Sequence, residues 1–145
     1  MSLVTFLNQN GYIQIPLSRS GVGHFHAEGF LNDRSISVLI DTGAASTVFS
    51  LDLARDMNLP MTKLSMFGGG AGAAQLEIHQ IQDARFAIGD ISPKTRALLA
   101  MDLSHVNQAL ALKNSSPVDA ILGVDALEAH SAVIDYGSNS LYLKV

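Results

Sequence analysis

The sequence contains no cysteine, which excludes disulfide bonds, cysteine-ligated zinc sites and cysteine nucleophiles together. Charged residues are also scarce: they make up 15% of the chain, against 48% for hydrophobic residues, a balance that argues against disorder. The net charge is −4 and no basic run is present, so the electrostatic footprint of a nucleic-acid-binding protein is missing. We therefore expect no nucleic-acid partner.

Long apolar runs are missing as well. No apolar stretch approaches the roughly 18 residues that a membrane span needs. Residues 1–9 lack a basic flank followed by a sustained apolar stretch, so no signal peptide is visible. We expect a soluble protein without a membrane span, cytoplasmic, or periplasmic if a signal peptide has been removed. The sequence does not choose between these compartments.

The 145 residues fit one domain, which can bury about two-thirds of its unfolded surface. We take residues 1–20 as an N-terminal segment with the first strand and residues 21–145 as the domain. Short strand-like segments alternate with glycine and Asn/Asp turns, which is typical of a mainly β barrel or sandwich. Strands are expected over residues 12–17, 25–31, 35–40, 76–88, 92–101, 120–122, 133–136 and 141–144, and helical segments over 50–57, 103–112 and 124–130.

The most informative feature is Asp41-Thr42-Gly43, which follows the apolar run 36–40. Gly43 allows the chain to turn sharply, and the Thr42 hydroxyl can brace the turn through a local hydrogen bond. A carboxylate at the mouth of a core strand is costly to bury unless it is paired or functional. Asp41 is therefore either a catalytic acid/base or a structural turn residue.

Two further sequence patterns, a glycine cluster and a histidine pair, each allow more than one interpretation. Residues 68–72 are rich in glycine and could form a flap, a plain loop or a dinucleotide-binding loop. The last needs a following helix, but residues 75–81 alternate like a strand, and no Gly-Lys-Ser/Thr signature of a phosphate loop is present. His24 and His26 lie on one strand face and could ligate a metal, but no third ligand is apparent, so we expect neither a metal nor a cofactor.

The run Asp41-Thr42-Gly43-Ala44, the glycine cluster and the later Ile121-Leu122-Gly123 together resemble the retropepsin-like aspartic proteases, particularly the bacterial single-domain members. The resemblance extends over residues 22–143 and implies an acid-protease β-barrel with one or two short helices. It implies that Asp41 is catalytic and that Thr42, Gly43 and Ala44 support the active-site loop. It also implies two further groups of site residues. The flap and substrate-binding residues are Gly68, Gly69, Gly70, Ala71 and Gly72, and the second-motif support is Ile121, Leu122 and Gly123.

Peptide hydrolysis by carboxylates needs two of them that share a proton, and this chain carries one such motif. A two-fold homodimer supplies the second Asp41, so the expected function is an aspartic endopeptidase that acts on peptide or protein substrates. The alternative is a catalytically silent peptide-binding or dimerisation module on the same fold. Retroviral enzymes carry arginine after the second-motif glycine, where this chain has Val124; the difference concerns the dimer contact and not the catalytic loop. Asp119, Asp125 and Asp135 are interpreted as caps and turn residues.

Overall fold

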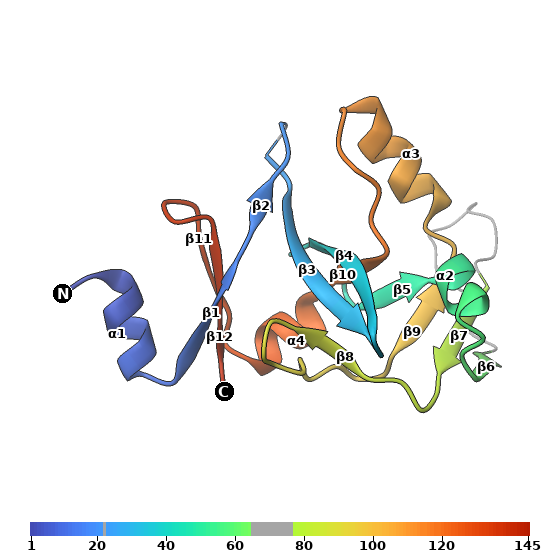
Figure 1. Cartoon of the computed structure of the whole chain (residues 1–145), viewed down its shortest axis with the longest axis horizontal. Coiled ribbons are helices and arrows are strands. Elements are labelled where there is room, and N and C mark those ends of the chain that lie inside the picture. Colours follow the sequence, from blue (N-terminus) through green and yellow to red (C-terminus); the bar gives the residue numbers. More distant parts are fainter. Residues whose placement is uncertain (22, 65–76) are drawn as a thin grey trace.

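The computed structural model of the chain describes residues 1–21, 23–64 and 77–145. Within these ranges the protein is mainly β, and four short helices accompany the strands (Figure 1). The elements are α1 (Leu3–Gln9), β1 (Tyr12–Pro16), β2 (Ser18–Arg19), β3 (Phe25–Leu31), β4 (Arg34–Ile40), β5 (Val48–Ser50), α2 (Leu51–Asp56), β6 (Met61–Leu64), β7 (Ile78–Ile81), β8 (Phe86–Ile88), β9 (Leu99–Met101), α3 (Ser104–Leu112), β10 (Ala120–Leu122), α4 (Val124–Ala129), β11 (Val133–Asp135) and β12 (Ser140–Lys144).

The larger sheet has the strand order β2-β3-β4-β10-β5-β9-β7-β6, and β8 pairs with β3 beside this path. Strand β10 lies between β4, to which it runs parallel, and β5, to which it runs antiparallel. Strands β5 and β9 are also parallel. The C-terminal part of the chain is thus inserted between two strands that are neighbours in the sequence, and this insertion joins the two predicted motifs.

A smaller sheet gathers the two ends of the chain, with β12 between β1 and β11. In Figure 1 α1 continues beyond this sheet at the N-terminal end, and Ile15, Leu141 and Leu143 of the sheet are buried in the main apolar cluster. The C-terminal residue returns to the same place, because the Val145 N–H donates to the Gly11 carbonyl at 2.9 Å. Residues from both ends of the sequence therefore stabilise one unit.

Local chemistry explains the elements that the sequence predicted. The β3–β4 hairpin turns at Asn32, whose φ is +52°, a conformation that asparagine tolerates better than most residues. Its side chain accepts a hydrogen bond from the Arg85 N–H at 2.9 Å. Helix α2 begins after Ser50, whose hydroxyl accepts from the Leu53 N–H at 3.2 Å, an ordinary N-cap. The predictions of this hairpin and this helix are confirmed.

Buried apolar residues form two clusters. The main one draws side chains from both sheets, α2 and α4, and it includes Val38, Phe49, Ile88 and Leu122 of the larger sheet. The second lies beneath α3 and consists of Leu39, Leu103, Leu110, Val118 and Ile121. Because Leu39 and Ile121 are register partners on β4 and β10, the second cluster covers one face of the two strands that end just before Asp41 and Gly123.

Three expectations are corrected or left open. The described residues form four helices, against the one or two that the resemblance implies, and α1 was not foreseen. The strand expected over residues 92–101 is confined to Leu99–Met101. Among the described residues the pairing leaves an open sheet, so closure into a barrel is not confirmed. No helix within the described ranges is long and apolar enough to cross a membrane.

Candidate active site

Asp41 follows directly after β4, at the end of the parallel β4–β10 pair. Its N–H continues the ladder by donating to the Leu122 carbonyl at 3.1 Å. The Gly43 N–H donates to Asp41 Oδ1 at 2.8 Å, and the Ala44 N–H donates to the Asp41 carbonyl at 3.3 Å. These bonds close a tight turn in which the carboxylate is half-buried and one of its oxygens is held by the backbone.

The second motif packs directly against this turn. A Cβ on Gly123 would lie 2.7 Å from the carbonyl carbon and oxygen of Ser46 and 2.8 Å from the Ala44 oxygen, a separation that only glycine permits. The following residue closes the contact, because the Val124 N–H donates to the Ala44 carbonyl at 2.8 Å. Residues 44–46 and 123–124 therefore interlock, although about 80 positions separate them.

A buried polar pair fastens the same contact. Asp125 Oδ1 accepts from the Thr47 N–H at 3.0 Å and from the Thr47 hydroxyl at 2.8 Å. The Thr47 hydroxyl oxygen in turn accepts from the Gly123 N–H at 3.1 Å. Thr47 is completely buried and Asp125 nearly so. Asp125 Oδ2 is buried without a partner among the described residues, whereas Oδ1 and both Thr47 groups are paired. Because paired buried polar groups fix a local geometry, these bonds hold the segment that follows the Asp41 turn.

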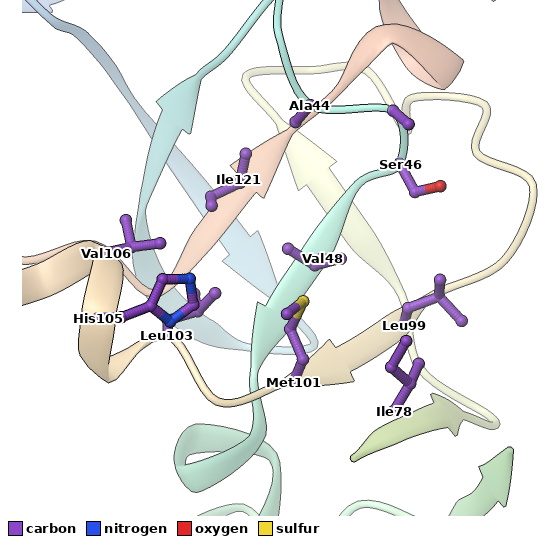
Figure 2. A pocket seen from close by; sticks show the side chains of 11 residues that line it. Ala44, Ser46, Val48, Ile78, Leu99, Met101, Leu103, His105, Val106 and Ile121 are labelled. Atoms are coloured by element: carbon purple, nitrogen blue, oxygen red, sulfur yellow. The ribbon is translucent and has the colours of Figure 1, made fainter. Parts of the chain in front are cut away.

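An apolar pocket of about 360 Å³ opens beside the turn. Figure 2 shows Val48, Met101, Val106 and Ile121 pointing into the space between β5, β10 and α3. Most of its lining is apolar, and it comprises Ala44, Ala45, Ser46, Val48, Ile78, Leu99, Met101, Leu103, His105, Val106 and Ile121. A concave, largely apolar site with few polar groups next to a turn carboxylate is a typical ligand site.

A second cavity, of about 390 Å³, lies on another side of the turn and includes the exposed Thr42. Its other lining residues come from α4 and β11 and the segment between them, and they are Val124, Leu127, Glu128, Ser131, Ala132 and Ile134. Strand β11 is at the edge of the smaller sheet. No other described strand pairs with its outer edge, and such an edge beside an exposed turn is a surface on which another chain can add.

The predicted site residues thus fall into three groups. Asp41, Thr42, Gly43 and Ala44 form the turn, and Ile121, Leu122 and Gly123 lie against it or line the pocket. The predicted flap, residues 68–72, lies outside the described residues. Among the described residues no group of three or more potential metal ligands is found, and His26 is buried on β3.

Sequence reasoning missed the role of Thr47 and interpreted Asp125 as a cap. The structure shows Asp125 bonded to the active-site turn, and the available signal was its place two residues after Gly123. The pocket was also missed, because its lining is drawn from β5, β7, β9, α3 and β10. No local pattern marks residues that only long-range pairing brings together.

The fold is similar to that of retropepsin-like proteases of known structure. A retropepsin-like aspartic protease from Rickettsia conorii is similar, with a TM-score of 0.56 and 18% identity over 92% of this chain and 89% of that one. The retroviral protease-like domain of Ddi1 from Leishmania major has a TM-score of 0.54 and 18% identity, over 81% of this chain and 86% of that one. The EIAV protease complexed with the inhibitor HBY-793 has a TM-score of 0.54 and 21% identity, over 81% of this chain and 98% of that one.

The family model "Aspartyl protease" matches residues 27–126, a range that contains both the Asp41 turn and the Gly123 contact. The chain therefore belongs to this aspartyl protease family, and its fold is retropepsin-like. No curated protein sequence matches the chain significantly.

Proposed function

We propose that the protein is an aspartic endopeptidase that works as a homodimer, with one Asp41 contributed by each copy. The observation that carries the proposal is the Asp41 turn itself: a half-buried carboxylate fixed at the end of a strand pair, next to an apolar pocket that begins at Ala44. Family membership supports a protease role. The backbone bond to Asp41 Oδ1 would also suit a structural turn, so the apolar pocket beside the carboxylate is what favours catalysis over capping.

The chemistry follows from two carboxylates held close together. They cannot both ionise at short range, so one carries a proton while the other is charged. The charged carboxylate takes a proton from water as the water oxygen attacks the peptide carbonyl carbon, and the protonated carboxyl gives its proton to the carbonyl oxygen. The carboxyl that received the water proton then passes it to the amide nitrogen. As the C–N bond breaks, a hydroxyl of the tetrahedral diol returns its proton to the other carboxylate, which releases a carboxylic acid and an amine and restores the shared proton.

The cavity beside Thr42 supports the choice of partner. Thr42 is exposed and adjoins the free edge of β11. A second copy related by a two-fold axis through this face would present the same turn and the same edge, as an isologous interface requires. The apolar Val124 and Leu127 line this cavity, so the proposed contact is apolar where retroviral enzymes use an arginine.

The apolar pocket supports a substrate class. Its eleven lining residues include Ser46 and His105 as the polar ones, so a large apolar side chain of a peptide fits it better than a charged one. Residues 68–72 stay a flap prediction from the sequence.

The test replaces Asp41 and mixes the two proteins. Asp41→Asn cannot act as the base or share the proton, so we expect hydrolysis of a peptide library to fall by at least about a hundredfold with the fold intact. When Asp41→Asn and wild type are mixed in equal amounts and allowed to exchange, activity should fall to about a quarter of that of an all-wild-type sample at the same total concentration, since only wild-type pairs hold two carboxylates. A mixture that keeps half the activity would contradict a shared site, and undiminished activity of Asp41→Asn would exclude Asp41 as catalyst. If wild type binds peptides but cleaves none, the silent binding module is the better description.

A further inference from the structure

Helix α3 forms one wall of the apolar pocket. Figure 2 shows Val106 and His105 on α3 and Leu103 just before it, facing Met101 and Val48 across the pocket. The floor on this side is Ile121 of β10. The distance between α3 and the sheet therefore determines the width of the pocket.

This wall is lightly attached by apolar contact. Of the nine residues of α3, Leu110 alone is fully buried, although Val106 packs partly against the second cluster. Its first turn is held by Asp102, whose Oδ1 accepts from the Ser104 N–H at 2.8 Å and from the Ser104 hydroxyl. One buried leucine contributes only about 1.5–3 kcal/mol, so polar contacts matter for the position of this helix.

The main polar contact is a pair of hydrogen bonds made by Asn107. Its Nδ2 donates to the Val118 carbonyl at 3.1 Å, and its Oδ1 accepts from the Val118 N–H at 2.8 Å. The side-chain amide thus pairs with the backbone of a buried residue two positions before β10. Since β10 carries Ile121, one side chain connects the wall of the pocket to its floor.

We propose that Asn107 is a positioning residue that fixes α3 over the sheet and thereby determines which apolar side chains of a peptide the pocket accepts. This inference rests on the proposed function, because it assumes that the pocket receives a substrate side chain. Asn107 touches no reacting group and is not among the residues that line the pocket. It acts through Val106 and His105, which precede it on the same helix.

Loss of the two Asn107–Val118 hydrogen bonds, which we call the Asn107 clamp, should change substrate selectivity more than the rate of the chemical step. With both bonds gone, α3 is held mainly by Leu110 and the Asp102 turn, so the wall can move away from Ile121. A looser pocket contacts a leucine-sized side chain less completely, and a difference of one methylene in a well-fitted pocket is worth about tenfold or more. We expect the preference for leucine over alanine at the corresponding peptide position to fall by about tenfold.

The experiment compares Asn107→Ala with Gln108→Ala, an exposed neighbour on the same helix. Peptides that differ only by leucine or alanine at each position are assayed for kcat and KM. In Asn107→Ala, KM for the leucine peptide should rise about tenfold, while kcat for the alanine peptide should stay within about twofold of wild type. Gln108→Ala should match wild type on both peptides. If Asn107→Ala does not fold, Asn107→Asp replaces it, because aspartate keeps the acceptor for the Val118 N–H and loses the donor. The preference of Asn107→Asp for leucine over alanine should also be lower than that of wild type.

Two outcomes would overturn the inference. An equal loss of kcat on every peptide would mean that Asn107 only maintains the fold, and an unchanged leucine preference in both Asn107 variants would mean that α3 does not set the pocket. Binding to proteins that carry Asp41→Asn, measured by calorimetry, separates this result from the proposed function. If wild type cleaves nothing but Asn107→Ala still reduces the preference in binding, the peptidase proposal fails and the positioning role stands.

Discussion

The active-site turn and helix α3 border the same pocket, yet they are held in different ways. The turn is fixed by buried hydrogen bonds among Thr47, Gly123 and Asp125 and by a glycine contact that leaves no space. Helix α3 has one fully buried side chain and the Asn107 clamp. A reacting carboxylate must be held within a fraction of an ångström, whereas a pocket wall that can shift allows selectivity to change without loss of the chemistry.

The largest effect is expected from Gly123→Ala, which disrupts the close contact between Gly123 and residues 44–46. The added Cβ would lie 2.7 Å from the backbone of Ser46, and a backbone atom cannot rotate away as a side chain can. Such overpacking costs about 1–3 kcal/mol or more, and here it separates the Asp41 turn from β10. We expect peptidase activity to be lost and the thermal midpoint to fall clearly.

The matched control is Gly21→Ala, since a Cβ at Gly21 would meet nothing within 4 Å. That variant should melt and cleave like wild type. If Gly123→Ala were as active as Gly21→Ala, the interlocked contact would not be what holds the turn.

The same contrast explains what the sequence could predict. The β3–β4 hairpin, α2, α4 and the terminal hairpin follow from local periodicity, caps and turn residues, and the Asp41 motif is itself a local pattern. The insertion of β10 between β4 and β5 is not local, because it pairs residues about 80 positions apart. The Thr47–Asp125 bond and the pocket follow from that insertion, so they could not be predicted from the sequence. Helix α1 was missed because its only N-terminal signal is Ser2, whose hydroxyl accepts from the Thr5 N–H.

A second effect, on stability, is expected at Asp125, where two variants separate hydrogen bonding from charge. Asp125→Ala leaves the Thr47 N–H and hydroxyl without their acceptor inside the protein, at a cost of about 1–3 kcal/mol for each unpaired group. Asp125→Asn keeps the accepting Oδ1, which receives both bonds. Denaturant unfolding should therefore show a much larger loss for alanine than for asparagine. Equal losses would mean that the charge of Asp125, rather than its accepting oxygen, holds the turn.

The smallest effect concerns pH and the α3 side of the molecule. His26 lies on β3, and it lines a groove with Ser116, from the loop between α3 and β10. Burial, and secondarily the nearby His24, lower the pKa of His26 below its ordinary value of 6.5. Its Nε2 is buried and has no partner among the described residues, so a proton there would gain no hydrogen bond to offset the lost hydration.

The sign of the pH effect follows from linkage. Above pH 6.5 the side chain is neutral in both the folded and unfolded states, so the stability that depends on it is fully present. As the pH falls from 6.5 through the lowered folded pKa, the unfolded chain takes up the proton first, and the free energy of unfolding decreases. His26→Gln should flatten this part of the stability profile, whereas Gln108→Ala, which replaces an exposed side chain that does not titrate, should leave it in place. Amide exchange on acidification should increase at residues 104–118 before it increases at residues 41–47, because His26 is the register partner of Leu39, which packs in the apolar cluster beneath α3. If both segments opened together, or if His26→Gln kept the wild-type slope, the two regions would not be held independently.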